Sequence, residues 1–183
     1  LLVGETSLVT ITFSEAVTDF TNADLSIENG TLSAVATVDG GVTWTATLTP
    51  ADGVEDATNV VTLNNATITD TAGLLGTGTT DSNNYAIDTH RPAATIAIAD
   101  ILLALSETSL VTITFSEPVT GFTNADLTIA NGTLTDVGSV DGGTTWTATL
   151  TPSADTSDNT NVIMLSNSGV QNSVGNSGQG TTS

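Results

Sequence analysis

The chain has 183 residues, of which 20 are acidic, one is basic, one is histidine and none is cysteine, giving a formal net charge of −19. So negative a chain cannot neutralise phosphates, which makes nucleic acid and anionic membranes poor partners, and without cysteine there are no disulfides and no thiolate metal sites. Hydrophobic residues still make up 38% of the chain and charged residues only 11%, so we expect a packed core rather than disorder, and no apolar run is long enough for membrane insertion.

A domain-sized repeat organises the sequence. Residues 5–15 recur almost unchanged as residues 107–117, and residues 20–25 recur as residues 122–127, at the same offset of 102 residues. This period is far longer than that of solenoid repeats, so each copy should own a core. We therefore expect two tandem domains, residues 1–89 and 90–183, with further modules on both sides.

Strict alternation of apolar and polar residues predicts strands throughout, and helical spacing appears nowhere. Asn131-Gly132 is a hairpin signal, and Asp141-Gly-Gly143 is a second turn. In chain order, strands are expected at residues 84–88 (strand G of copy 1) and, in copy 2, at 95–99 (A), 109–115 (B), 126–130 (C), 133–140 (D), 145–150 (E) and 161–165 (F).

Seven short strands in about 100 residues indicate a β-sandwich with immunoglobulin-like topology. The strand at 95–99 is the first of a module and has no counterpart in copy 1. The strand at 84–88 is the last and has no counterpart in copy 2. The predicted fold is therefore all-β, with two tandem sandwiches of about seven strands each, copy 1 lacking strand A and copy 2 lacking strand G. Trp44 and Trp146 are expected in the cores.

Several phrases of the sequence resemble the bacterial Ig-like repeats of giant secreted adhesins, among them RTX-type and biofilm-associated proteins. These phrases are Thr-Ile-Thr-Phe-Ser-Glu-Pro-Val (112–119), Phe-Thr-Asn-Ala-Asp-Leu (122–127), Asp-Gly-Gly-x-Thr-Trp-Thr-Ala-Thr-Leu-Thr-Pro (141–152) and Tyr-Ala-Ile-Asp-Thr-x-Arg-Pro (85–92). The resemblance implies a stack of modules that extends a terminal binding domain from a bacterial cell surface into the extracellular space. It also implies neighbouring repeats of the same chain as partners, calcium at the linkers and no catalysis.

The loop before the last strand departs from the family pattern Asp-x-Ala-Gly-Asn. Copy 1 has Asp70-Thr-Ala-Gly-Leu74 and copy 2 has Asn172-Ser-Val-Gly-Asn176, so each copy lacks one oxygen ligand of that phrase.

Acidic residues should gather at the pole of each sandwich where the B–C, D–E and F–G loops lie. Converging carboxylates repel one another unless a cation lies between them, and Ca²⁺ suits such a site because it takes six to eight oxygen ligands in flexible geometry. We therefore predict an interdomain calcium site. Its candidate ligands are Asp88, Glu117 and Asp126, with Asp141 and the F–G-loop Asn172 as further candidates. At the same pole of copy 1 the candidates are Glu15, Asp24, Asp39 and Asp70.

The residues also suggest three functions other than a spacer. Glu15 and Asp24 are the best carboxylate pair for glycoside hydrolysis, but with two Trp and one Tyr the chain lacks the aromatic platforms of a sugar cleft, so no enzyme is expected. Recognition of glycan, host protein or ice by the modules is an alternative to a spacer role. A third is lateral homotypic or fibre-forming assembly through exposed strand edges, because an unpaired strand is a template for another chain.

Overall fold

The computed structural model describes residues 1–183, which form two compact units, Leu1–His90 and Arg91–Ser183. The boundary lies one residue from the one expected from the sequence. Four 3₁₀ turns are the only helices, and no helix is long and apolar enough to cross a membrane.

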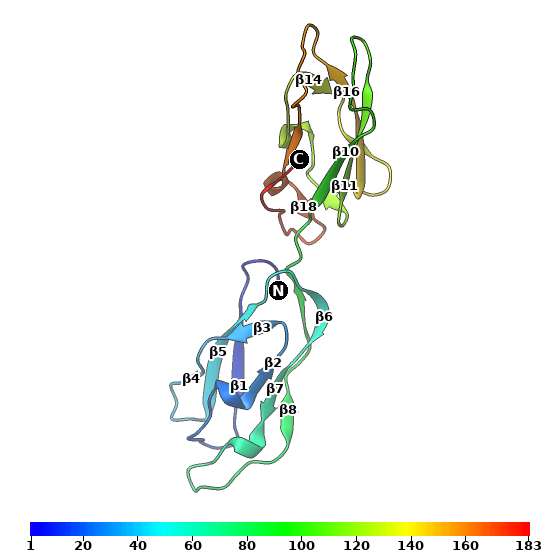
Figure 1. Ribbon diagram of the computed structural model, residues 1–183. Helices are drawn as coiled ribbons and strands as arrows, with labels where there is room; N and C mark the ends of the chain where they lie inside the picture. Colours follow the sequence, from blue (N-terminus) through cyan, green and yellow to red (C-terminus); the bar gives the residue numbers. More distant parts are fainter. The chain divides into compact units, whose positions relative to one another are not determined.

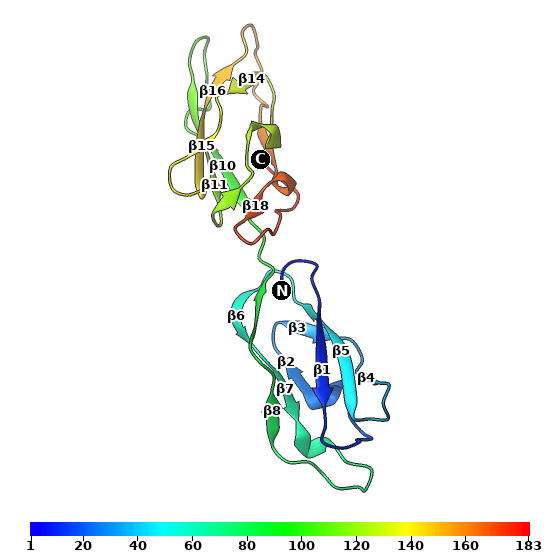
Figure 2. The ribbon, with the colours of Figure 1, turned by 180° about the vertical axis from the view of Figure 1, so that it is seen from behind.

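Unit 1 is built of nine strands and two 3₁₀ turns (Figure 1). They are β1 (Ser7–Thr12), η1 (Asn22–Asp24), β2 (Leu25–Ile27), β3 (Gly30–Leu32), β4 (Ala36–Thr37), β5 (Thr43–Pro50), β6 (Glu55–Asn59), β7 (Val61–Asn64), η2 (Asn65–Thr67), β8 (Thr79–Asp81) and β9 (Tyr85–Asp88). One sheet has the order β1-β5-β3 with β4 also on β5, and the other has the order β2-β7-β8, while β6 pairs with β9. Figure 2 shows β1 beside β5 in the first sheet.

Unit 2 repeats this plan with ten strands and two 3₁₀ turns. They are β10 (Ala94–Ile98), β11 (Ser109–Phe115), β12 (Val119–Thr120), η3 (Asn124–Asp126), β13 (Leu127–Ile129), β14 (Gly132–Leu134), β15 (Gly138–Ser139), β16 (Thr145–Pro152), β17 (Ile163–Ser166), η4 (Asn167–Gly169), β18 (Gln171–Asn172) and β19 (Thr181–Thr182). The sheets have the orders β10-β11-β16-β14, with β15 on β16, and β13-β17-β19, and β12 pairs with β18. All pairs are antiparallel, as in a sandwich of the immunoglobulin type.

The strands predicted at 95–99, 109–115 and 145–150 are found, and each copy lacks the strand expected to be missing, but the units contain nine and ten strands rather than about seven. In unit 2, β10 pairs with β11, whereas β1 of unit 1 has no strand on that edge. In unit 1, β9 pairs with β6, and unit 2 has no strand equivalent to β9. Unit 2 does contain the short strand that precedes it in unit 1, because β19 is the counterpart of β8 and pairs with β17 as β8 pairs with β7.

Each unit has its own apolar core between its sheets. In unit 2 the fully buried side chains include Val111, Ile113 and Leu165, each with no exposed surface. The alternating burial of β11 is the predicted one, with its threonines directed away from the core. Burying each such aliphatic side chain contributes about 1.5–3 kcal/mol, so the core can hold the unit without a disulfide.

The predicted strand at 133–140 is wrong in its middle, because it is two short strands rather than one. The side chain of Asn124 inserts there: its Nδ2 donates to Thr135 O (2.9 Å), and its Oδ1 accepts from Val137 N (2.8 Å). Between β14 and β15, the backbone therefore forms hydrogen bonds with the Asn124 side chain. Val140, expected inside the strand, lies in the following turn with its side chain fully exposed.

The two tryptophans lie at the edge of the cores rather than inside them. Trp146 is half-buried and packs edge-on against the buried Phe122, with 5.3 Å between the ring centroids. Its Nε1 donates to Gly143 O (2.9 Å), and this bond keeps the polar edge of the indole toward the D–E turn. Trp44 makes the same contacts with Phe20 and Gly41. An indole at this place closes one end of the core and also needs an acceptor for its N–H.

Candidate functional site

The three loops that were expected to share a pole do converge in each unit. In unit 2 the Val119 backbone joins them, because Val119 N donates to Gly143 O of the D–E turn (3.1 Å) and Val119 pairs with Asn172 of the F–G loop. In unit 1, Val17 N donates to Gly41 O (3.1 Å), and Val17 forms a bridge with Asp70. The prediction that sequence-distant loops meet at this pole is confirmed.

Asp141 organises the D–E turn of unit 2 with its carboxylate. Oδ1 accepts from Thr145 N (2.9 Å), Thr144 N (3.2 Å) and Ser139 Oγ (2.8 Å). Backbone hydrogen bonding from Thr145, followed by its side-chain counterpart and Ser139, lowers the pKa of Asp141 to about 2. The carboxylate therefore stabilises its own turn and remains ionised well below neutral pH.

Asp39 does the same in unit 1. Its carboxylate accepts from Thr43 N (2.9 Å), Val42 N (3.2 Å) and Thr37 Oγ1 (2.9 Å). The backbone bond from Thr43 is the largest cause that lowers the pKa of Asp39 to about 2.

Asp24 and Asp126 each close a capping box on a 3₁₀ turn. Asp126 Oδ2 accepts from Thr123 N (2.9 Å), and Asp24 Oδ2 accepts from Thr21 N (2.8 Å). Asp24 also accepts from Thr67 Oγ1 (2.6 Å) through its other oxygen. Burial would raise the pKa of Asp24, but the bonds from Thr67 and Thr21 outweigh burial and lower that pKa.

In the F–G loop, Asp70 of unit 1 and Asn172 of unit 2 each accept hydrogen bonds from backbone N–H groups of their own loop. Asp70 Oδ1 accepts from Ala72 N (2.8 Å) and Leu74 N (2.9 Å). Asn172 Oδ1 accepts from Val174 N (3.2 Å) and Asn176 N (2.9 Å). Since one acceptor oxygen is enough for this turn, aspartate and asparagine are interchangeable here. The residue at the end of the loop differs, because Asn176 is buried and Leu74 is exposed.

The remaining three candidates lie on strand ends and loops. Glu15 is exposed, and Glu117 and Asp88 are half-buried. Asp88 is the last residue of β9, where its backbone N–H donates to Leu1 O (2.9 Å).

The candidate acids do not form a metal cluster inside either unit. No group of three or more acidic or histidine side chains is close enough together to hold a metal ion. The physical reason is visible in the hydrogen bonds: Asp141, Asp126 and Asp24 direct their oxygens toward N–H and hydroxyl groups of their own loops. Asp88 belongs to unit 1, and Glu117 and Asp126 belong to unit 2. Calcium binding by that shared set stays a prediction.

A second polar network lies at the opposite end of the strands, and the sequence reasoning missed it. In unit 1, Asn29 Nδ2 donates to Asp56 Oδ2 and to Asn59 Oδ1, both at 2.9 Å. In unit 2, Asn131 Nδ2 donates to Asp158 Oδ2 (3.1 Å) and Asn161 Oδ1 (2.8 Å). The sequence did contain a signal for this network, because Asp56 recurs as Asp158 although the other residues of 51–57 all differ from those of 153–159.

Comparison with known proteins agrees with this geometry. The family model for the bacterial Ig-like domain matches residues 1–87 and again residues 88–183. The chain belongs to the bacterial Ig-like domain family. A comparison with curated proteins finds no match. The family assignment agrees with the sandwich found in both units and is consistent with a structural module in a tandem array.

Proposed function

We propose that this pair of bacterial Ig-like domains is an extender segment of a large, secreted bacterial surface adhesin. The observation that carries the proposal is the tandem repetition of one self-sufficient sandwich, with the boundary between two consecutive residues, His90 and Arg91. Each unit has its own buried core, so adding units lengthens the protein without new packing requirements. Neighbouring repeats of the same chain are the expected partners.

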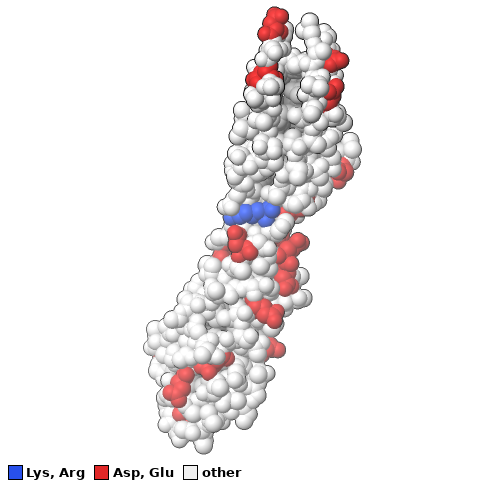
Figure 3. All heavy atoms as spheres, in the orientation of Figure 1, with Lys and Arg blue, Asp and Glu red and all other residues white.

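The electrostatics support a spacer on an extracellular surface. Acidic side chains occur in separate groups over both units (Figure 3), and the net charge of −19 keeps such modules soluble and apart from one another. The carboxylates of the loop pole serve their own turns and are not arranged as a nucleophile, base or acid around a cleft. A non-catalytic role accounts for these features with the fewest assumptions.

We further propose that Ca²⁺ stiffens the connection between repeats. Asp88 lies two residues before the boundary, and Glu117 and Asp126 come from the unit that follows. Six to eight oxygens are needed for Ca²⁺, and carboxylates with backbone carbonyls from two units could supply them. Extracellular sites of this kind bind with Kd of roughly 10⁻⁴–10⁻³ M, so millimolar calcium would be required.

Small-angle X-ray scattering tests both parts of the proposal. The 183-residue protein is measured with millimolar calcium and again after chelation, and Asp88→Asn serves as the variant that removes one carboxylate. A larger maximum dimension with calcium, lost in Asp88→Asn, supports the stiffened linker. Equal and extended dimensions in both conditions would refute the calcium part and leave the spacer. A compact particle in both conditions would refute the spacer itself.

A further inference from the structure

Residues 89–93 connect β9 of unit 1 to β10 of unit 2. Each residue of a chain has only two soft backbone dihedral angles, so motion of one unit against the other must arise from rotation within this stretch. The boundary between the units lies inside it, after His90. Hydrogen bonds inside each unit show which of these residues move with which unit.

Thr89 belongs to the fold of unit 1. It is 2% exposed, its N–H donates to Val54 O (2.6 Å), and its carbonyl accepts from Gly53 N (3.3 Å). Its hydroxyl donates to Ala51 O (2.6 Å) and accepts from Val54 N (3.0 Å). Every polar group of this residue is thus bonded to the E–F loop (residues 51–54, between β5 and β6), so Thr89 moves with unit 1.

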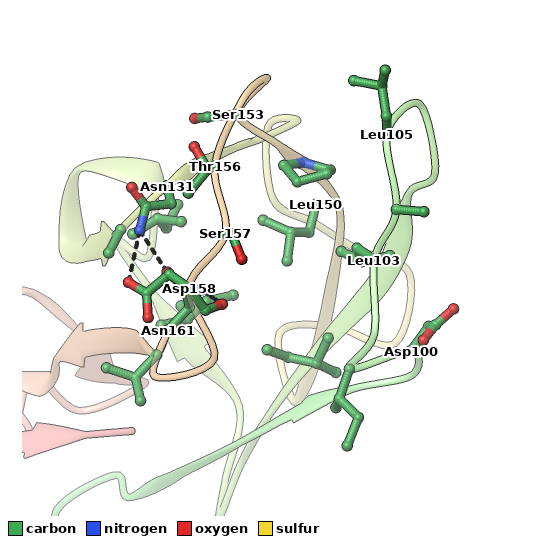
Figure 4. A pocket seen from close by; sticks show the side chains of 18 of the residues that line it. Asp100, Leu103, Leu105, Asn131, Leu150, Ser153, Thr156, Ser157, Asp158 and Asn161 are labelled. Atoms are coloured by element: carbon green, nitrogen blue, oxygen red, sulfur yellow. Dashed lines mark hydrogen bonds between the residues drawn. The ribbon is translucent and has the colours of Figure 1, made fainter.

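The E–F loop of unit 1 is tied at both ends to the hairpin turn at Asn29. Ala51 N donates to Asn29 O (2.8 Å), and Asn29 Nδ2 donates to Asp56 Oδ2 (2.9 Å). Figure 4 shows the counterpart of the side-chain bond in unit 2, where Asn131 bonds to Asp158. Because the same bonding recurs in both units, the shape of the loop is a property of the repeat.

Residues 91–93 belong to the fold of unit 2. Arg91, the only Lys or Arg of the chain, donates from Nη1 to Ser177 O (2.8 Å) of the F–G loop. Ala93 N donates to Ser116 Oγ (3.0 Å), and Ser116 N donates to Ala93 O (2.8 Å). These bonds join the segment to the F–G loop and to the end of β11, so it moves with unit 2.

Pro92 stiffens this segment from within. It is buried, its ring fixes its own φ at about −65°, and it restricts the preceding Arg91 to extended conformations. Its carbonyl lies close to Gly178, where a Cβ would come 3.0 Å from Pro92 O and 2.7 Å from Asn167 O. A glycine at this place in the F–G loop therefore lets the loop lie against the segment.

We propose that residues 91–93 act as a strap that confines motion between the repeats to the backbone of His90, even when no calcium is bound. Thr89 moves with unit 1 and Arg91 moves with unit 2, so the direction of the chain changes only through the dihedral angles between them. This role rests on the proposed extender function, because a spacer keeps its length only if its joints are restricted. Calcium would then act on the one joint that the strap leaves.

Hydrogen exchange of the whole 183-residue protein in chelator tests the strap. The Ser116 amide is bonded to Ala93 O, so its exchange reports opening of the strap, and Arg91→Ala removes the bond to Ser177 O. Loss of one hydrogen bond from a charged group should speed exchange at Ser116 by roughly 10- to 100-fold. The Val119 amide, bonded to the D–E turn at the same pole, is the control and should change by less than about threefold. An unchanged rate at Ser116, or equal acceleration of both amides, would overturn the strap.

Spin labels test whether the motion occurs at His90. The chain has no cysteine, so labels can be attached at Thr49→Cys and Thr151→Cys, exposed counterparts in the two units. Double electron–electron resonance in chelator then measures the width of the distance distribution between them. Alanine is compared with glycine at two positions: His90→Ala with His90→Gly, and the native Ala93 with Ala93→Gly.

Glycine gives the backbone the same added freedom at either position. We expect it to widen the distribution at residue 90, and to leave the width unchanged at residue 93, where hydrogen bonds hold the backbone. Equal widths for alanine and glycine at residue 90, or a wider distribution with Ala93→Gly, would overturn the proposal and leave the spacer in place. A compact particle in the scattering experiment would instead refute the spacer, so the two failures are distinguishable.

Discussion

Replacing Asn124 by alanine removes the side chain that separates β14 from β15. Its two short hydrogen bonds are lost, one to Thr135 O (2.9 Å) and one from Val137 N (2.8 Å), together with a long one to Leu134 O (3.5 Å). Each such bond contributes a net of about 0.5–1.5 kcal/mol, so we expect the free energy of unfolding of unit 2 to fall by about 1–3 kcal/mol. In a domain of this size 1 kcal/mol corresponds to about 4–8 °C in the unfolding midpoint, which gives a fall of about 4–24 °C.

Differential scanning calorimetry of the whole protein measures this change. Since each unit has its own core, two transitions are expected, and Asn124→Ala should lower only one of them. The twin variant Asn22→Ala should lower the other by a similar amount, because Asn22 bonds to Ser33 O (2.9 Å) and Val35 N (2.8 Å) in the same way. Val140→Ala, at a fully exposed side chain, is the control and should change neither. An unchanged midpoint in both asparagine variants would refute this account of the strand break, and a shift of both transitions by one variant would refute independent units.

Acid should weaken the two D–E turns over a defined pH range. The pKa values of Asp39 and Asp141 are lowered from the ordinary 3.8 to about 2, so their contribution to stability is present above the unfolded value and is lost as pH falls toward 2. NMR titration of the Thr145 amide should have its midpoint near 2. At the same turn, Gly143 has φ +104°, and a Cβ there would lie 2.5 Å from Val119 O. Backbone strain alone costs about 1–3 kcal/mol, so with the added clash Gly143→Ala should lower the free energy of unfolding of unit 2 by more than that in chemical denaturation.

Each of these two predictions has a matched control. In the titration, Asp141→Asn should abolish the pH-dependent shift of Thr145 and leave that of Thr43 in place; a midpoint near 4 in the unaltered protein would contradict the role of the hydrogen bonds. For the glycine, the neighbouring Gly142 has φ +84° with nothing within 4 Å of its Cβ position. Gly142→Ala should therefore cost only the backbone strain, and equal costs at both positions would exclude the clash as the cause.

The long strands could be predicted from the sequence because each one shows its own alternation of apolar and polar residues. The strand at 109–115 is found at those residues, since alternation of Val111, Ile113 and Phe115 with threonine fixes both its existence and its buried face. The strand at 145–150 is found with two further residues at its end. The strand that each copy lacks followed from the offset of the repeat alone.

The strand at 133–140 was predicted wrongly because a side chain from a distant part of the sequence forms hydrogen bonds with its backbone. Nothing in the alternation of residues 133–140 reveals that Asn124 enters the ladder between them. The two-residue strands β12 and β18 are too short to have a pattern, and they exist because the loops at their pole meet. The acids are predicted as calcium ligands because their loops converge; the convergence is confirmed, and calcium binding stays a prediction. Their hydrogen bonds depend on the local path of each turn, which residue types and spacing leave open.

Calcium is expected to change the extension of the chain and to leave the stability of each unit unchanged. The pole carboxylates are already stabilised by their own loops: Asp70 accepts from two backbone N–H groups, and Asp141 accepts from two more and a hydroxyl. We therefore expect each unit to fold without a cation. An ion bound inside one unit at ten times its Kd would stabilise that unit by about 1.4 kcal/mol, or about 6–11 °C. We expect chelation to shift both calorimetric transitions by less than about 2 °C while the scattering dimension shrinks, and a fall of one transition by the larger amount would place the ion within a unit instead.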